Sequence, residues 1–458
     1  WIFFGLLLAF ISYIYQDAVA TQRHGIEVWN VLWQGKMLDY YSHCYQNTSC
    51  AAAYDITIYI LFGIWNFPVW IFEKITGINS QNISFFLIYG KGLVVITWLG
   101  CYKITGEIYN RIIKSEVNNK MYSPGVFFAI SPLVTVYSIY TGNYDILSLF
   151  FILLGIYMLF ENNIKCFILS FAISISIKYF ALWIFILLII MYEKKVHKIL
   201  EYTFMGVSIS IAEKLIFRND MILKMAGGDS LIYSNALSGV IHAGESNIFG
   251  LGQVSICLVL YIFLCIYCYL EIPENSSEFR YKCIYVCMCA WSIFFMFFQY
   301  NSYWIILMIP FMTGLVFSDR DRFVINLILE IVFTVGIYIS MNIRQWWIVG
   351  YPNGASTSEA VDSILRGIFH MEIGGTYSIG QWMYRLNDKI EIFSIANSVC
   401  IAALAAILYI NRPGSKVKVV NAESMEKIIY RLRMGLAVCL LVLAPIIYII
   451  QIIVFNVP

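Results

Sequence analysis

Asp17 and Asp145 both stand at the edge of long apolar runs, where a carboxylate can take part in acid–base chemistry. Asp17 follows an apolar run at 1–16 in the sequence Tyr-Ile-Tyr-Gln-Asp. A carboxylate at a membrane boundary is partly desolvated, which suits a general base, but it can equally be an interfacial acid that ends a helix. If the helix continues, His24 and Glu27 follow about two and three turns later and either line the same cleft or stay on the surface.

Asp145 closes the sequence Gly142-Asn143-Tyr144-Asp145, directly before an uninterrupted apolar run. Gly142 and Asn143 allow a tight turn. Asp is a favourable residue at the start of a helix, where its carboxylate can accept a backbone N–H. The pattern therefore indicates either a capped hairpin between two helices or a second acid near Asp17, with Asn143 and Tyr144 as candidate sugar-binding neighbours.

Cationic and aromatic residues offer further candidates for binding. Lys178, in Ser-Ile-Ser-Ile-Lys-Tyr-Phe, could extend to the membrane surface or bind an anionic headgroup or phosphate. Gln299 and Tyr300 open a polar, aromatic turn that suits sugar binding, although an interfacial aromatic belt is the favoured interpretation. Arg344 and Arg385 could clamp a phosphate through two hydrogen bonds each, or could be solvated loop charges.

The composition decides which class of protein must position these residues. Of 458 residues, 60% are hydrophobic and only 13% are charged, whereas a soluble domain carries about 45–50% apolar and about 25% charged residues. A water-soluble enzyme and a disordered protein are both excluded. The net charge of +2 excludes nucleic-acid binding by bulk charge. The sequence predicts an all-α, polytopic membrane protein.

Apolar runs bounded by charges predict the spans. A spanning helix needs about 20 apolar residues, and we expect about 13 spans, at 1–16, 83–104, 123–141, 145–161, 164–177, 179–192, 198–217, 251–271, 281–299, 302–317, 322–341, 391–410 and 434–455. Since the first run already begins at Trp1, we expect a short leader to precede it.

The distribution of basic residues predicts which side each connector faces. The positive-inside rule places the basic connectors 103–120, 193–198 and 411–433 in the cytoplasm. This order of spans requires that 56–75, which contains Asn66 and Pro68, lies along the outer leaflet as a juxtamembrane helix instead of crossing.

Three long segments, 17–82, 218–250 and 342–390, then lie outside and are where any chemistry is expected. Cys44 and Cys50 lie in the first of them, and they could form a disulfide in an oxidising compartment.

The order of these features resembles the GT-C superfamily of integral-membrane glycosyltransferases, which use polyprenyl-phosphate-linked sugars. An acid follows the first span, and an outer segment holds a helix along the membrane. Residues 142–145 are similar to the family's Gly-Gln-x-Asp turn, with Asn143 in place of Gln, and residues 174–180 to its Ser-x-Lys-x-Phe/Tyr segment. Residues 299–310 are similar to its Gln-Tyr-Trp segment before a Leu-Pro-Phe run. The resemblance is good over 1–190, moderate to 320 and only hydropathic beyond, which suggests a family-type module at 1–190 and a variable one at 191–458.

The resemblance implies a mechanism and roles for individual residues. Asp17 would be the general base and Asp145 the second catalytic acid, while Lys178, with Arg344 or Arg385, would bind the donor phosphate. Transfer of a hexosyl or mannosyl group to a hydroxyl of a lipid, glycan or protein would invert the anomeric carbon on the extracytoplasmic side of the bilayer. His24, Glu27, Asn143, Tyr144, Gln299 and Tyr300 would contact the sugar or the acceptor.

The chain departs from the family at one point that bears on metal binding. The family often pairs two acids near the first span, whereas Gln16-Asp17 offers one. A hard divalent cation needs more oxygen ligands than Asp17 and Asp145 supply, so we expect no metal and no other cofactor.

Two other kinds of membrane protein fit parts of the sequence. A flippase or transporter of lipid-linked sugars would place charges near the bilayer midplane, where this chain has only Lys91, Glu213 and Glu330 as exceptions. An envelope-polysaccharide polymerase or ligase would carry its catalytic Arg and His in a large outer loop, so that 342–390 would matter more than Asp17.

Overall fold

The computed structural model describes residues 2–48, 52–80, 83–112, 123–217, 245–247, 253–298, 300–344, 386–415 and 423–455. They form two compact units that interleave along the chain. The first comprises Trp1–Val19, Ile71–Ile146 and Asn301–Pro458, and the second comprises Ala20–Trp70 and Leu147–Tyr300. The predicted modules 1–190 and 191–458 follow sequence resemblance instead of packing, so this division leaves them as predictions.

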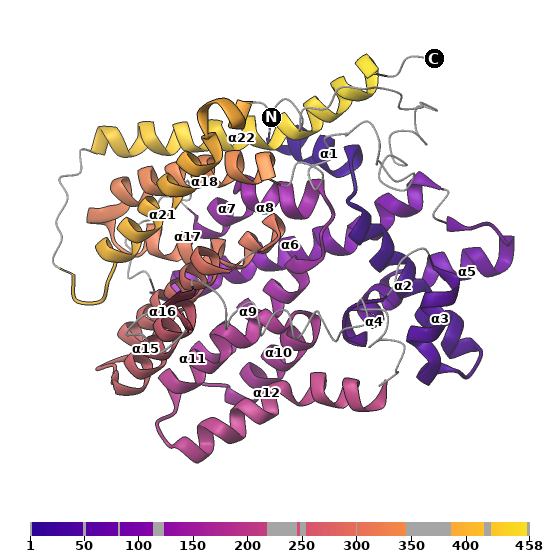
Figure 1. Ribbon diagram of the computed structural model, residues 1–458, viewed down its shortest axis with the longest axis horizontal. Helices are drawn as coiled ribbons and strands as arrows, with labels where there is room; N and C mark the ends of the chain where they lie inside the picture. Colours follow the sequence, from indigo (N-terminus) through magenta and orange to yellow (C-terminus); the bar gives the residue numbers. More distant parts are fainter. Residues whose placement is uncertain are drawn as a thin grey trace. The chain divides into compact units, whose positions relative to one another are not determined.

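Among its described residues, the first unit has only helices as regular secondary structure, and α18 (Phe323–Arg344) and α21 (Ile392–Ile410) pack along each other (Figure 1). A buried ion pair of 2.9 Å joins Glu330 of α18 to Arg433 of α22. The unit contains the first turn of α2 (Gln16–Trp33), most of α5 (Phe67–Thr76), α1 (Ile2–Ser12), α6 (Ser84–Ile112), α7 (Pro124–Ala129), α8 (Pro132–Val134), η3 (Thr135–Tyr140), η5 (Ser302–Leu307), α17 (Ile309–Phe317), η6 (Arg320–Arg322), α18 (Phe323–Arg344), α21 (Ile392–Ile410) and α22 (Glu423–Phe455).

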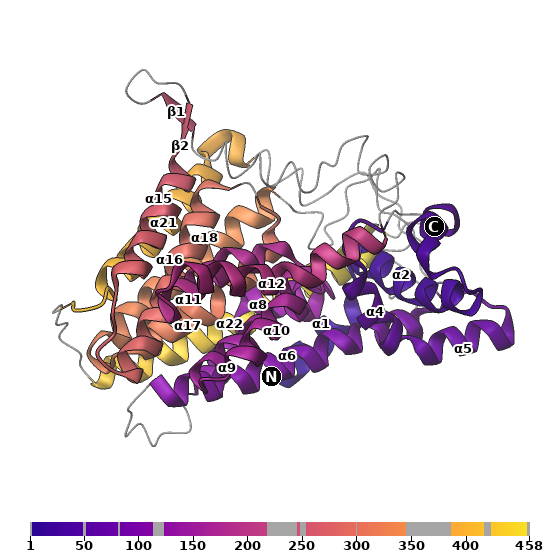
Figure 2. The same ribbon diagram turned by 90° about the horizontal axis from the view of Figure 1, so that it is seen from below.

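The second unit is also mainly helical, and a short antiparallel pair of strands, with Glu245 opposite Ser255, leads into α15 (Figure 2). Within this unit α10 packs against α12. The unit contains the rest of α2 and of α5, η1 (Met37–Asp39), α3 (Tyr40–Asn47), α4 (Ile56–Trp65), α9 (Asp145–Phe160) apart from its first two residues, α10 (Ile164–Ile177), η4 (Tyr179–Ala181), α11 (Leu182–Tyr192), α12 (Val196–Ile216), β1 (Glu245–Asn247), β2 (Gln253–Ser255), α15 (Ile256–Leu270) and α16 (Ser276–Phe297).

Helix length and apolar composition support a multi-pass membrane protein, but not the predicted number of spans. Among the described residues, five helices are long and apolar enough to cross a membrane, or up to seven if two bent pairs each count as one span. Five further apolar helices have only 10–17 residues. A helix of 16 residues is about 24 Å long, shorter than a hydrocarbon core of about 30 Å. The count of 13 is therefore not confirmed.

Proline explains two places where a predicted helix is broken. The segment 56–75 forms α4 and α5, which are bent by 67°, because Pro68 lacks an N–H and its ring clashes with a continuous helix. The predicted span 123–141 is divided into α7, α8 and η3, and Pro124 and Pro132 begin the first two of these.

Candidate active site

The segment before Asp17 and the segment before Asp145 are joined directly within the first unit. The chain leaves α1 at Ser12 and enters α2 at Gln16. In this break, the Tyr15 N–H donates to the carbonyl oxygen of Thr141 at 2.8 Å. The rings of Tyr13 and Tyr140 stack with their centroids 4.9 Å apart. The structure therefore brings together the two turns that carry the predicted acids.

Asp17 lies half-buried in the first turn of α2. Its neighbours Ala18 and Val19 are buried in a small apolar cluster with Ile14 and Leu87, which fixes the start of the helix against α6. The positive end of a helix dipole stabilises a negative charge in this first turn. The local sequence therefore holds a carboxylate at a defined position while leaving it partly open to solvent.

Asp145 begins α9 and is only 1% exposed. Gly142 has a φ of +72°, a conformation that favours glycine and lets the chain reverse direction before the helix. The Asn143 Oδ1 atom accepts the Asp145 backbone N–H at 2.8 Å. Asn143 therefore supports the turn, and both it and Tyr144 are 1% exposed.

One part of the aromatic turn 299–304 reaches this region. Tyr303 lies with its ring centroid 6.2 Å from that of Tyr15, and its hydroxyl accepts a hydrogen bond of 2.8 Å from the Asn301 amide. Tyr300 belongs to the second unit, where its ring packs edge-on against Phe295 at 4.6 Å. Gln299 lies outside the described residues.

Lys178 is buried in the second unit, directly after α10. Its Nζ atom donates to the Tyr54 hydroxyl at 3.3 Å and lies 4.3 Å from the centroid of the same ring. The Tyr41 hydroxyl fixes the position of Tyr54 by donating to its carbonyl oxygen at 2.8 Å. The predicted phosphate ligand is thus held by an aromatic residue that sequence reasoning did not single out.

Further polar residues of the second unit form a cluster that the sequence did not predict. The Asp55 carboxylate accepts hydrogen bonds from Ser210 at 2.5 Å and Lys214 at 2.9 Å. The Glu213 carboxylate accepts one from Ser176 at 2.5 Å and another from Thr57. The mid-helix charge of Glu213 was the one available signal for this cluster, since charges within apolar segments are functional candidates by default.

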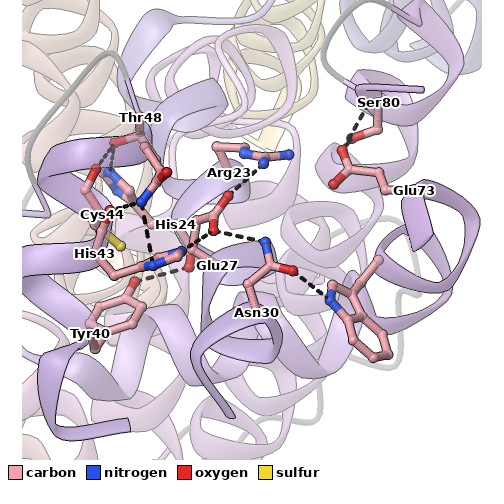
Figure 3. A network of polar contacts seen from close by, with 12 residues as sticks. Arg23, His24, Glu27, Asn30, Tyr40, His43, Cys44, Thr48, Glu73 and Ser80 are labelled. Carbon is pink, nitrogen blue, oxygen red and sulfur yellow. Dashed lines mark hydrogen bonds and ion pairs between the residues drawn. The ribbon is translucent and has the colours of Figure 1, made fainter. Parts of the chain in front are cut away.

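His24 and Glu27 are both buried in an extended polar network of the second unit (Figure 3). The Glu27 carboxylate pairs with Arg23 at 2.5 Å and His43 at 2.8 Å, and it accepts a hydrogen bond of 2.8 Å from Asn30. The ring of His24 lies 3.3 Å, Nε2 to Oγ1, from Thr48. These contacts give both residues a structural function, and their predicted contact with sugar stays a prediction.

The remaining predicted residues lie at or beyond the limits of the described chain. Arg344 ends α18, and Arg385 and Cys50 lie outside the described residues. The described ranges contain no group of three or more His, Cys, Asp or Glu residues that could hold a metal ion. The expectations for phosphate clamping by these arginines, for the disulfide and for metal dependence therefore stay predictions.

Comparison with known proteins gives no family assignment. No family model matches the chain, and no curated protein matches it. One similar solved structure is the arabinosyltransferase EmbB from Mycobacterium smegmatis, with a TM-score of 0.40 and 11% sequence identity. The similarity covers 98% of this chain but 40% of that chain. Similarity at this level identifies neither a family nor an activity.

Proposed function

We propose that this protein is a membrane glycosyltransferase that moves a sugar from a polyprenyl-phosphate donor to an acceptor hydroxyl on the outer face of the membrane. The observation that carries the proposal is the hydrogen bond from Tyr15 to Thr141, with the stacked rings of Tyr13 and Tyr140. These contacts join the turns bearing Asp17 and Asp145, the acids to which the family resemblance assigns the chemistry.

Exposure suggests different roles for the two acids. Asp17 is half-buried and can meet a reactant, whereas Asp145 is 1% exposed and held at the start of α9. A general base must come within hydrogen-bond reach of the proton that it removes. We therefore assign proton removal to Asp17. We assign to Asp145 a supporting role, in which it stays at the start of α9 and adds a second negative charge to the site.

The reaction is a single displacement at the anomeric carbon. Asp17 accepts the proton of the acceptor hydroxyl as its oxygen attacks that carbon, and the bond from the carbon to the phosphate oxygen breaks. The departing polyprenyl phosphate takes the bonding electrons, and one displacement inverts the anomeric centre. The family resemblance assigns the stabilisation of the phosphate charge to Lys178, and this assignment stays a prediction.

Membrane location follows from the donor. A polyprenyl chain stays in the bilayer, so its phosphate and sugar stay at the surface and the catalytic groups must be presented there. The five long apolar helices found among the described residues would hold the protein in the same bilayer. A soluble enzyme would have to extract the lipid from the membrane and expose its apolar surface to water.

The test compares Asp17→Asn with Asp39→Asn, which changes an exposed acid of the same predicted outer segment. Full-length protein in lipid nanodiscs receives undecaprenyl-phosphate mannose, glucose or galactose, or decaprenyl-phosphate arabinose, with an envelope extract of the source cells as acceptor. Release of polyprenyl phosphate is measured by mass spectrometry. We expect D17N to lose about 10²–10⁴-fold in turnover, and D39N to match wild type.

Two results would contradict the proposal. Wild-type turnover in a folded D17N variant would remove Asp17 from the chemistry. No release from any donor by the wild-type protein would remove the transferase function itself and favour a transporter of lipid-linked sugars.

A further inference from the structure

Lys91 is a lysine of α6 buried in the first unit, with 1% of its surface exposed. Its Nζ atom donates to the backbone carbonyl oxygens of Phe10 at 2.6 Å, Tyr13 at 2.7 Å and Tyr140 at 3.0 Å, and that of Ala9 lies at the longer distance of 3.5 Å. An ammonium group has three N–H donors, so the three shorter contacts match its full capacity. A buried charge is costly unless its hydrogen bonds are satisfied, and this arrangement satisfies them.

The carbonyl groups of Phe10, Tyr13 and Tyr140 lie at the ends of helices or between two helices, where they need a hydrogen-bond donor. Phe10 lies in the last turn of α1, and Tyr140 is the last residue of η3. The final carbonyls of a helix have no partner within it and carry the negative end of its dipole. Tyr13 lies in the break that follows α1. One ammonium group therefore caps two helical ends and the chain break between α1 and α2.

The carbon stem of Lys91 also fits closely against the turn that precedes Asp145. A Cβ atom added to Gly142 would lie 3.1 Å from Lys91 Cγ and 3.4 Å from Ile14 Cγ1. Glycine at this position therefore leaves room for the lysine stem as well as supplying the positive φ. Lys91 therefore contacts the turn through its carbon stem, and the helix ends through its ammonium group.

We infer that Lys91 is a positioning residue that fixes the turns of Asp17 and Asp145 in one geometry. The inference rests on the proposed function. Ordinary polar contacts between membrane helices join one helix surface to another. Lys91 instead binds the backbone of Tyr13, four residues before Asp17, and of Tyr140, five residues before Asp145. A displacement of about 1 Å in a catalytic group can cost about 10²-fold in rate, so loss of this clamp should slow the reaction while substrate binding persists.

The experiment uses Lys91→Gln and Lys91→Met in the full-length protein in nanodiscs. Gln and Met have similar size and shape, but Gln keeps two N–H donors and Met keeps none. A difference in behaviour between the K91Q and K91M variants therefore reports the loss of hydrogen bonds and not a change in side-chain volume. Lys103→Met, at an exposed lysine of the same helix, is the matched control.

Hydrogen exchange measures the clamp without any substrate. The Tyr15 N–H, bonded to Thr141, and the Gly142 N–H, bonded to Ser138, report on the two turns. We expect exchange in peptides covering 10–20 and 136–146 to be slowest in wild type and K103M, faster in K91Q and fastest in K91M.

Turnover of the polyprenyl-phosphate donor measures the consequence for catalysis. We expect K91M to lose about 10²-fold in kcat with KM nearly unchanged, K91Q to be intermediate and K103M to match wild type. Equal exchange in all variants, or wild-type kcat in K91M, would overturn this inference alone. A wild-type protein without transfer would overturn the proposed function, and the positioning role with it.

Discussion

Three buried charged side chains, Lys91, Glu27 and Glu330, have polar partners on other elements of the structure. Lys91 binds backbone carbonyls, Glu27 binds Arg23 and His43, and Glu330 binds Arg433. Leaving any of these charges unpaired would cost several kcal/mol. The sequence identified Lys91 and Glu330 only as unusual charges within apolar runs. Their partners could not be predicted, because carbonyl groups carry no residue type and a distant side chain leaves no local pattern.

The same reasoning at the scale of one residue gives a prediction for Cys44. Burial of this side chain in α3 raises the pKa of its thiol to about 12, so that almost no thiolate exists at neutral pH. We expect N-ethylmaleimide at pH 7.5 to leave Cys44 unmodified in the native protein, as read by mass spectrometry of its peptide, and the rate to rise with pH.

Denaturation provides the control and tests the predicted disulfide as well. If Cys44 is a free thiol, denaturation in SDS alone makes it reactive. If Cys44 and Cys50 are bonded, modification also requires a reducing agent. Fast modification of Cys44 in the native protein at pH 7.5 would contradict the burial on which the prediction rests.

At the scale of elements, apolar runs predicted where helices occur better than they predicted where helices stop. The runs at 164–177 and 391–410 agree closely with α10 and α21. The run 123–141 looked continuous because hydropathy does not record the break between α7 and α8, which begins at Pro132. The turn at Gly142 was predictable from its residue types, whereas its contacts with Tyr15 and Lys91 depend on tertiary packing.

Two glycines with the same backbone angle allow the packing at this turn to be measured. Gly142 has a φ of +72° and close neighbours, whereas Gly77 has a φ of +71° and open space around its Cβ position. Alanine at either site should cost about 1 kcal/mol or more from the positive φ. We expect Gly142→Ala to lower the thermal midpoint more than Gly77→Ala, since the added methyl group also meets the Lys91 stem. Equal shifts would show that the stem moves aside freely.

At the scale of the whole molecule, the chain passes four times between its two compact units, so neither unit is one continuous stretch of sequence. Composition alone was sufficient to predict a helical membrane protein, because apolar content is a property of the whole chain. The division into interleaved units was not predictable, since it depends on contacts between segments far apart in sequence. Asp17 and Asp145 fall in one unit and Lys178 in the other.

The side of the membrane on which Asp17 lies can be tested with two single cysteine substitutions. Asp39 is exposed in the predicted outer segment 17–82, and the side chain of Lys198, at the basic connector 193–198, is 39% exposed. Because positively charged connectors stay in the cytoplasm, we expect a membrane-impermeant maleimide to label Asp39→Cys on intact cells. It should label Lys198→Cys only after permeabilisation.

The pattern of labelling decides which leaflet supplies the donor. The wild-type chain, treated in parallel, gives the background from its native cysteines. If D39C alone is labelled on intact cells, the segment of Asp17 faces outward and the donor must be a lipid-linked sugar of the outer leaflet. If K198C alone is labelled, the topology is inverted, and Asp17 would act on the cytoplasmic side, where nucleotide sugars compete as donors. Labelling of both would contradict the positive-inside assignment, because two positions on the same side require an even number of crossings between them.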